Sequence, residues 1–211
     1  MSWKTDACAS SAEVLAKKFQ KRGMNFYHVQ TKEEAKEKIL SLIPEGSSVT
    51  WGGSVSMEEA GVTEAIINGN YEFIDRGNFS SPEEKRALYG KIVCSDYFLM
   101  STNAFTADGE LVNIDGASNR VACLAHGPQH VIVLASMNKL CQNTEDAIRR
   151  IRLHACPPNA LRVHADTPCA RTGFCADCTS DDCICCQIMI TRFSRIKGRI
   201  TVILTDEELG F

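Results

Sequence analysis

Six of the eleven cysteines of this 211-residue chain fall in the stretch from Cys169 to Cys186. Thiolates are soft ligands that suit zinc and iron–sulfur clusters, and the C-x2-C pair of Cys175 and Cys178 can grip one metal ion or one edge of a cluster. The segment is otherwise rich in small and polar residues, so hydrophobic burial alone would not order it. We therefore expect a bound metal centre here. Redox or disulfide chemistry, and thiols without a function, remain as alternatives.

The expected location of the chain is the cytoplasm, where thiols stay reduced. Its first residues, Met-Ser-Trp-Lys-Thr-Asp, do not resemble a secretory signal, and no apolar stretch with basic flanks follows them. The longest apolar run, residues 131–135, is far too short to cross a bilayer. Secreted disulfide scaffolds, which also crowd cysteines, are usually short chains with a signal peptide.

Composition and charge exclude several classes of function. Charged residues make up 23% of the chain, and the formal net charge of −3 removes the electrostatic case for nucleic acid as the main partner. Aromatic residues are only 7%, too few for a base-stacking platform. A chain of this length can bury a sizeable core, so we expect one α/β domain over residues 1–211 that binds neither nucleic acid nor membrane. The Cys-rich metal-binding segment is expected at about residues 166–187 of it.

Helical and strand patterns alternate along the chain, which predicts an open, mostly parallel sheet with helices on both faces. Thr31 and Glu34 form a capping-box pattern at a helix start, and Gly61 interrupts the helical stretch 57–67. A helix over residues 147–155 is expected to end before Pro157. Residues 107–110 predict a hairpin turn. The expected strands cover residues 26–29, 48–51, 71–74, 97–100, 130–135 and 199–204.

Four polar motifs follow predicted strands, and ligands in parallel sheets gather at the carboxyl ends of strands. The glycines after residue 51 would let the backbone approach a ligand closely and turn amides toward an anion. Arg120 could clamp a carboxylate or phosphate, Asp115 could exchange a proton, and Lys139 could supply a point charge. The candidate ligand-binding residues are Gly52, Gly53, Ser54, Asn103, Thr106, Asp115, Asn119, Arg120, Asn138 and Lys139.

Each of these motifs alone is also typical of a purely structural feature. Glycine turns, polar strand ends, Asp-Gly turns and surface lysines are common without any ligand. Their occurrence after four predicted strands favours a ligand cleft over four unrelated turns. The sequence contains no G-x-S-x-G, H-E-x-x-H or paired-carboxylate pattern that would select a hydrolase.

The same residues resemble the lactate-utilisation domain (LUD, formerly DUF162) family, in its short form with a C-terminal cysteine motif. The resemblance covers about residues 10–211, and its most specific part is the block at residues 98–116. That block reads Phe-Leu-Met-Ser-Thr-Asn-Ala-Phe-Thr-Ala-Asp-Gly-Glu-Leu-Val-Asn-Ile-Asp-Gly. Further matching motifs are Trp51-Gly52-Gly53-Ser54, Asn119-Arg120-Val121-Ala122, Gly127-Pro128-Gln129-His130, Asn138-Lys139 and residues 199–204.

The resemblance implies a fold like that of the sugar-isomerase and coenzyme A transferase superfamily. It also implies a role near the oxidation of L-lactate to pyruvate, beside an iron–sulfur redox partner protein. The ligand implied by that role is a small anionic metabolite, a hydroxy or keto acid. Fold analogy does not fix the reaction, because this fold hosts isomerases, transferases and ligand sensors alike. An oligomeric assembly is compatible with the resemblance.

Carried over position by position, the family's cysteine pattern implies four metal ligands in a C-x5-C-x2-C-x6-C spacing. Cys183 and Cys186 stand where the family places other residues. The implied redox role favours a 4Fe-4S cluster, with a four-cysteine zinc site as the alternative. The implied ligands are Cys169, Cys175, Cys178 and Cys185.

Three functions are compatible with these residues. The first is a redox-linked lactate-utilisation protein. The second is an isomerase- or transferase-like enzyme, or a ligand sensor, whose metal is purely structural. The third is a non-catalytic subunit that regulates an iron–sulfur oxidoreductase.

Overall fold

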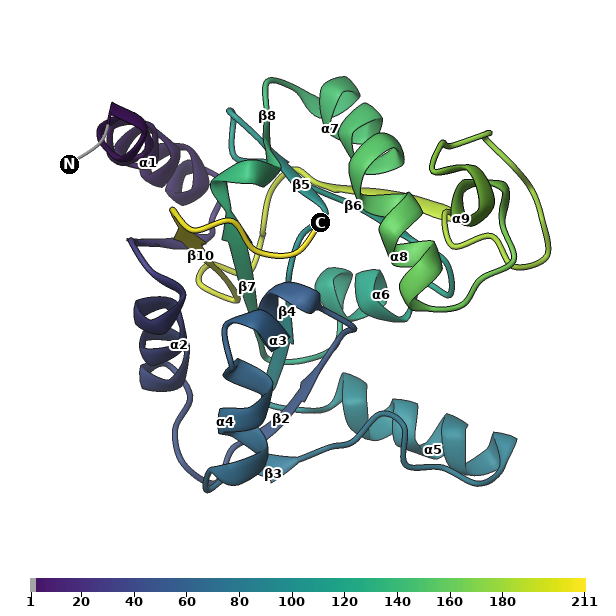
Figure 1. Ribbon diagram of the computed structural model, residues 1–211. Helices are drawn as coiled ribbons and strands as arrows, with labels where there is room; N and C mark the ends of the chain where they lie inside the picture. Colours follow the sequence, from purple (N-terminus) through teal and green to yellow (C-terminus); the bar gives the residue numbers. More distant parts are fainter. Residues whose placement is uncertain (1–2) are drawn as a thin grey trace.

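The computed structural model describes residues 3–211 and contains a six-stranded, all-parallel sheet. The strand order is β1-β10-β7-β4-β2-β3, and the carboxyl ends of these strands meet at one edge of the sheet (Figure 1). The predicted α/β class with an open parallel sheet is confirmed. The strands are β1 (Asn25–Val29), β2 (Ser48–Trp51), β3 (Glu72–Phe73), β4 (Tyr97–Met100), β7 (His130–Ser136) and β10 (Ile200–Thr205).

Helices cover both faces of this sheet because side chains alternate along each strand. On β7, Val131, Val133 and Ala135 pack on one face, and Ile132 and Leu134 pack on the other. The first face is covered by α1 (Trp3–Lys21), α5 (Pro82–Val93) and α6 (Asn119–Ala125). The second is covered by α2 (Lys32–Ser41), α3 (Val55–Glu59) and α4 (Val62–Asn68). Within residues 3–211, no helix is both long and apolar enough to span a bilayer.

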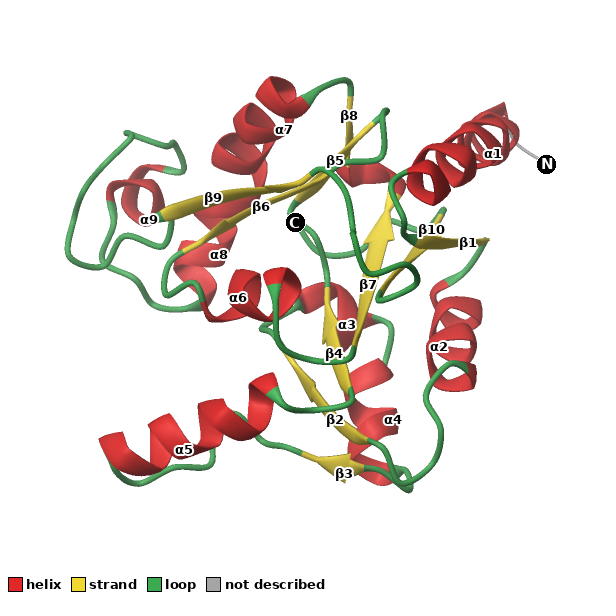
Figure 2. Cartoon of the chain, turned by 180° about the vertical axis from the view of Figure 1, so that it is seen from behind, coloured by secondary structure: helices red, strands yellow, loops and turns green. Residues whose placement is uncertain are grey.

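A second, smaller sheet lies beside the first, and the sequence analysis did not predict it (Figure 2). Its order is β8-β5-β6-β9, with β9 antiparallel to β6. Ala104, Val112 and Ile114 from this sheet pack on a helical rod. The elements are β5 (Ala104–Thr106), β6 (Leu111–Asp115), β8 (Leu140–Cys141), β9 (Gln187–Thr191), the 3-10 turn η1 (Met137–Lys139), α7 (Thr144–Arg150), the π-helix η2 (Ile151–Ala155), α8 (Cys156–Arg162) and α9 (Pro168–Thr172).

Several local predictions are confirmed at the ends of these elements. Thr31 and Glu34 form the capping box of α2. Gly61 separates α3 from α4 and has a φ of 66°, a left-handed conformation that favours glycine. The turn at residues 107–110 joins β5 and β6 as an antiparallel hairpin.

The prediction that a helix ends before Pro157 is wrong. The rod passes from α7 into η2, and α8 begins at Cys156 with proline in its first turn. Proline lacks the amide hydrogen that an interior helical position donates, but the first helical positions have no intrahelical acceptor for it. The π-helix η2 therefore leads directly into a new α-helix, α8, and the helical segment does not end before Pro157. This continuation brings Arg162 to the site described below.

Replacing Ile132 with alanine should lower the free energy of unfolding by about 2–5 kcal/mol. Ile132 is 2% exposed in β7, one of the two central strands of the large sheet. It packs in the core cluster under α2, α3 and α4, which leaves little freedom to close the cavity. Urea denaturation followed by circular dichroism measures the loss. The matched control is Ile67→Ala on α4, where the side chain is 55% exposed and the change should stay below about 0.5 kcal/mol. Equal losses from both variants would contradict this assignment of the core.

Candidate functional site

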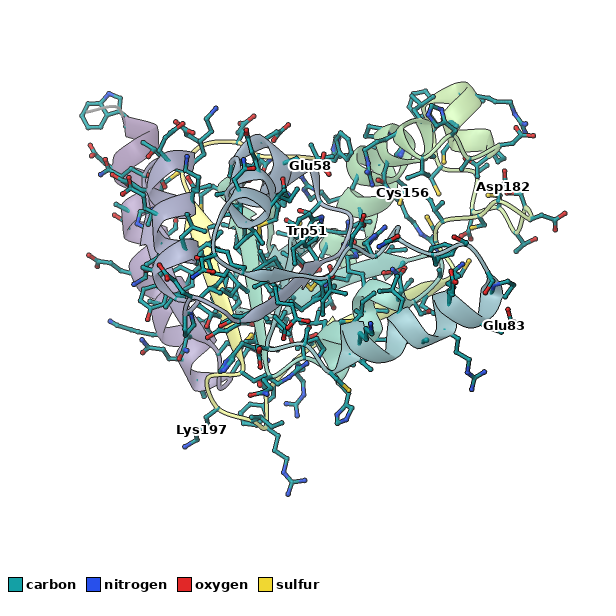
Figure 3. All side chains as sticks on the ribbon, turned by 90° about the horizontal axis from the view of Figure 1, so that it is seen from below. Trp51, Glu58, Glu83, Cys156, Asp182 and Lys197 are labelled. Carbon is teal, nitrogen blue, oxygen red and sulfur yellow. The ribbon has the colours of Figure 1, made fainter. Side chains whose placement is uncertain are left out.

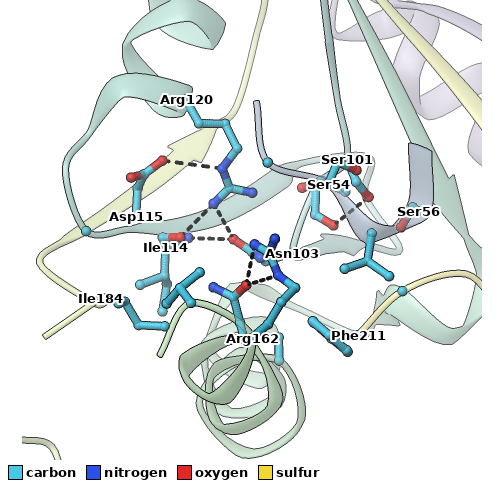
Figure 4. Close-up of a pocket in the computed structure, with 18 of the residues that line it drawn as sticks. Ser54, Ser56, Ser101, Asn103, Ile114, Asp115, Arg120, Arg162, Ile184 and Phe211 are labelled. Carbon is cyan, nitrogen blue, oxygen red and sulfur yellow. Dashed lines mark hydrogen bonds and ion pairs between the residues drawn. The ribbon is translucent and has the colours of Figure 1, made fainter. Parts of the chain in front are cut away.

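One cavity of about 230 Å³ lies at the carboxyl edge of the six-stranded sheet (Figure 4). Segments that follow β2, β3, β4, β7 and β10 contribute to its lining, as expected for a ligand site in a parallel sheet. The end of β6, α6, α8 and the Cys-rich segment also contribute to the lining. The cavity therefore joins the two sheets.

Most of the sequence-predicted ligand residues come together here. Three do not line the cavity: Gly52 packs against a cavity residue, Thr106 binds a backbone amide within the β5–β6 hairpin, and Asn138 accepts a hydrogen bond from a neighbouring serine. Those three shape the surroundings of the site. The residues that do line it are Gly53, Ser54, Asn103, Asp115, Asn119, Arg120 and Lys139.

Arg120 lines the cavity and ties its parts together (Figure 4). Its Nη2 donates to the Ile114 carbonyl at 2.7 Å and to the Asn103 carboxamide oxygen at 2.9 Å. Its Nε donates to the Asp115 carboxylate at 3.3 Å. Burial lowers the pKa of the guanidinium, and the negative charge of Asp115 opposes that shift. An arginine keeps its charge in a protein, so Arg120 holds a positive charge inside the site.

The two glycines after β2 contribute differently. A Cβ at Gly52 would lie 2.9 Å from Arg120 Cγ, so only glycine leaves room for the arginine to pack there. A Cβ at Gly53 would instead meet Arg162 Nη2 at 3.5 Å and Arg76 Nη2 at 3.8 Å. The guanidinium groups of Arg76 and Arg162 therefore converge over the Gly53 backbone.

The sequence analysis missed Arg76 and Arg162. Arg162 donates from Nε at 3.1 Å and from Nη2 at 2.8 Å to the Asn159 carboxamide oxygen. Arg76 makes no hydrogen bond or ion pair with any side chain or backbone group of residues 3–211. Arg76 follows β3 just as the other motifs follow their strands, so the same strand-end signal pointed to it. Arg162 had no such signal, because the predicted helix was expected to end before Pro157, upstream of this residue.

Lys139 is only 3% exposed and lines the cavity. Its Nζ donates to Ser56 Oγ at 2.8 Å and to Ser101 Oγ at 2.9 Å, and no carboxylate of the described chain forms an ion pair with it. Burial lowers the pKa of Lys139 to about 7, and the positive charge of Arg150 adds to the shift. Lys139 is therefore an amine that exchanges its proton near neutral pH.

The cavity carries an excess of positive charge. Asp115 is the one acidic residue in its lining within the described part of the chain, and Arg120 already binds that carboxylate. Opposing it are four basic side chains, those of Arg76, Arg120, Lys139 and Arg162. Such an arrangement attracts anions.

A second cavity, of about 30 Å³, lies in the Cys-rich segment. Figure 3 shows sulfur atoms gathered near the labelled Cys156. The four ligands implied by the family pattern all line this cavity, and two further cysteines join them, whereas Cys186 does not. The lining cysteines are Cys156, Cys169, Cys175, Cys178, Cys183 and Cys185.

These cysteines lie near one another without surrounding a common point. Within residues 3–211, no group of three or more cysteine, histidine, aspartate or glutamate side chains is arranged to hold a metal ion. Cys156 and Cys185 form a pair with Sγ atoms 3.2 Å apart, and this contact, together with burial, raises the pKa of Cys185. The donor set suits a soft metal or an iron–sulfur cluster. Sequence reasoning missed Cys156, because only the restart of the helix at that residue brings it to the segment.

The two cavities share a wall. Ile184 lines both of them. Its backbone packs on Gly116, where a Cβ would lie 3.1 Å from Ile184 Cα. Beside this contact, the backbone amide of Cys186 donates to the carbonyl of Asp115 at 2.9 Å. The residue whose carboxylate binds Arg120 therefore also anchors the Cys-rich segment.

Comparison with known protein families matches residues 12–205 to the LUD domain. The chain belongs to the LUD domain family. The resemblance drawn from the strand-end motifs is thereby confirmed. No curated protein matches this LUD domain.

This LUD domain is also similar to a solved structure, the crystal structure of a DUF162 family protein from Deinococcus radiodurans. The two chains share 10% sequence identity with a TM-score of 0.55, over 94% of this chain and 98% of that chain. At this identity the likeness concerns the fold alone, and it agrees with the α/β architecture.

The lowered pKa of Lys139 makes the stability of the fold depend on pH. Between the folded-state pKa of about 7 and the ordinary value of 10.5, the unfolded state binds more protons, so the free energy of unfolding rises with pH. Lys139→Met should remove this rise, which is at most about 1.4 kcal/mol per pH unit. Urea unfolding of both proteins from pH 6 to pH 10 measures the difference.

Cysteine thiols also titrate in this pH range, but both proteins contain the same thiols. Their contribution therefore cancels when the unfolding free energy of Lys139→Met is subtracted from that of the wild type. The control variant is Lys91→Met, which replaces an exposed lysine on α5. The difference between its free energy of unfolding and that of the wild type should not change with pH. A flat difference for Lys139→Met as well would show that Lys139 keeps an ordinary pKa.

Proposed function

We propose that this LUD domain binds a small hydroxy or keto acid in the positively charged cavity, beside a metal centre held by the Cys-rich segment, as part of a redox-linked protein. The observation that carries the proposal is the shared wall at Ile184. Electron transfer requires a redox centre close to the substrate that it serves. Two cavities that share the lining residue Ile184 meet that requirement.

Unpaired cationic donors support an anionic ligand. Nη1 of Arg120, Nη1 of Arg162 and the whole Arg76 guanidinium have no hydrogen-bond partner among the described residues. Arg76 and Arg162 are exposed, so these donors are open to water or to a ligand. A carboxylate bound there gains charge-assisted, bidentate hydrogen bonds.

The cavity volume supports a small acid over a coenzyme A thioester. Pockets for drug-sized ligands typically measure about 300–1,000 Å³. At about 230 Å³ this cavity falls below that range. An acid of the size of lactate or pyruvate fits it, whereas most of a coenzyme A molecule would remain outside.

Four thiols would hold the metal centre. The hydrogen bond from Ser180 lowers the pKa of Cys178, which favours the thiolate form that metals bind. The redox role implied by the family favours a 4Fe-4S cluster, which supplies one-electron transfer when bound. The proposed ligands are Cys169, Cys175, Cys178 and Cys185.

A structural zinc ion is the second candidate, and the size of the small cavity favours it. The cavity volume of about 30 Å³ is only a few times the roughly 10–15 Å³ that holds one water molecule. One ion fits this space, whereas a four-iron cluster would require the Cys-rich segment to move outward. With zinc, the LUD domain would be an isomerase- or transferase-like enzyme or a ligand sensor, and the metal would only hold the segment in place.

Arg162→Ala should weaken the binding of pyruvate and L-lactate by about 10- to 100-fold, because it removes a charge-assisted hydrogen bond to the carboxylate. Isothermal titration calorimetry on the intact protein measures the change. The control is Arg149→Ala on α7, an exposed arginine paired with Glu145 away from the cavity, which should bind both acids as the wild type does. Equal binding by both variants would exclude Arg162 from the site, and no binding by the wild type would overturn the proposed ligand class.

Protein purified without oxygen should contain metal, and Cys175→Ser should lose most of it. About four iron and four sulfide per chain, with colour that bleaches on reduction, is the expected result for the cluster. One zinc per chain in a colourless protein would select the second candidate. Elemental and sulfide analysis, together with the visible spectrum, separates the two.

The matched control for the metal measurement is Cys186→Ser. Cys186 lies in the same segment, but its thiol donates to the Cys183 carbonyl at 3.2 Å and does not line the cavity. This variant should keep its metal. Wild-type protein without iron or zinc would overturn the metal centre itself.

A further inference from the structure

We propose that Lys139 is a covalent attachment site that forms an imine with the carbonyl carbon of a small 2-keto acid whose carboxylate lies on the arginines of the cavity. The inference rests on the keto-acid ligand of the proposed function and adds a chemical role that binding alone does not require. The hydrogen bonds of Nζ, the charges around it and the position of the arginines support it.

The hydrogen bonds of Lys139 leave one position on Nζ free. Ser56 Oγ donates to the Leu209 carbonyl at 3.3 Å, and Ser101 Oγ donates to the Thr102 carbonyl at 3.3 Å. Both hydroxyls therefore present lone pairs to Nζ, which donates to each. Cε and these two hydrogens fill three tetrahedral positions, and no hydrogen-bond or ion-pair partner among residues 3–211 takes the fourth.

The surroundings of Lys139 disfavour its charged form. Burial is the main cause, Arg150 and Arg120 add positive charge, and only the Glu59 carboxylate opposes them. Glu59 accepts the Gly210 amide hydrogen at 2.7 Å and makes no ion pair with Lys139. With a pKa of about 7, about half of Lys139 is neutral at neutral pH. In that form the fourth position is a lone pair, as a nucleophilic amine requires.

The arginines can hold a keto acid in a suitable orientation. Figure 4 shows Ser56 and Ser101 on one side of the cavity and Arg120 with Asp115 on the other. A carboxylate on the free Nη1 of Arg120, with Arg162 nearby, leaves the adjacent carbonyl group directed toward the serine side, where Lys139 lies. Holding both reactants in one closed site favours their reaction over reaction in solution.

Imine formation needs no further reagent. The Nζ lone pair attacks the carbonyl carbon, and the C=O π electrons move to oxygen, which is protonated. The oxygen then leaves as water, which carries away the two hydrogens of the amine, and a C=N bond remains. The hydroxyls of Ser56 and Ser101 contact Nζ and can pass these protons. No electrons are gained or lost overall.

A purely ionic role for Lys139 explains less of the site. Arginine is always charged and matches a carboxylate geometrically, so the cavity already holds the better anion binders. A lysine kept only for its charge gains nothing from a setting that lowers its pKa. A nucleophilic lysine requires that setting.

Borohydride trapping on the full chain tests the inference. Wild-type protein is incubated with pyruvate and sodium cyanoborohydride, which reduces an imine to a stable secondary amine, and is then digested and analysed by mass spectrometry. The expected result is a reduced pyruvate adduct on the peptide that contains Lys139, at least about tenfold above the level with L-lactate, which has no carbonyl group. Lys139→Arg should lose the adduct, and Lys91→Arg should retain it.

Calorimetry with pyruvate on the same preparation separates the two proposals. Binding without an adduct on Lys139 overturns the imine and leaves the proposed ligand class standing. Neither binding nor adduct overturns both. Adducts spread evenly over exposed lysines also overturn the imine. Because the wild-type peptide gives the answer directly, the result stands even where circular dichroism shows that Lys139→Arg does not fold.

Discussion

Positive charge held in a partly closed space is the constraint on which the rest of this site depends. Arg120 and Arg150 cannot lose their protons, so the fold must solvate them in place of water. Main-chain and carboxamide oxygens do most of this: Arg120 binds the Ile114 carbonyl and the Asn103 carboxamide, and Arg150 binds the carbonyls of Asn103 and Asn138. These bonds join the helical rod and the small sheet to the strand ends of the large sheet.

Asp115 offsets only part of this charge, and the neutral oxygens leave the rest in place, so a net positive charge acts on the one basic group of the cavity that can respond. Lys139 lies among the same residues, and it can release a proton near neutral pH where the arginines cannot. The arginines thus have two effects on the site. They attract an anion, and they keep the neighbouring amine partly neutral. A carboxylate that entered the cavity would offset part of their charge, so ligand binding and the protonation of Lys139 are linked.

The parts of the site that the sequence predicted are those with local signals. Strand and helix periodicity predicted the parallel sheet, and the polar motifs that follow its strands predicted Gly53 and Asn103, because parallel strands end at one edge. Arg120 was predicted from its own polar motif, which follows β6 of the small sheet. Non-local features were missed. Arg162 and Cys156 reach their places only through a π turn that carries a helix past Pro157, and no propensity rule indicates that turn. The small sheet depends on β6 pairing with β9, far apart in the chain. The burial of Lys139 likewise comes from the packing of distant segments.

The Cys-rich segment and the anion cavity cannot be independent, whatever the cysteines bind. The Asp115 carbonyl accepts the Cys186 amide hydrogen, and the Asp115 carboxylate binds Arg120. Gly116 adds a close backbone contact with Ile184, which lines both cavities. Anything that orders the segment therefore also orders one wall of the anion site. Because linkage is reciprocal, an anion that fixes Arg120 and Asp115 stabilises the segment in return. This coupling holds for a redox cluster and for a structural zinc ion alike, because it follows from contacts within the chain itself.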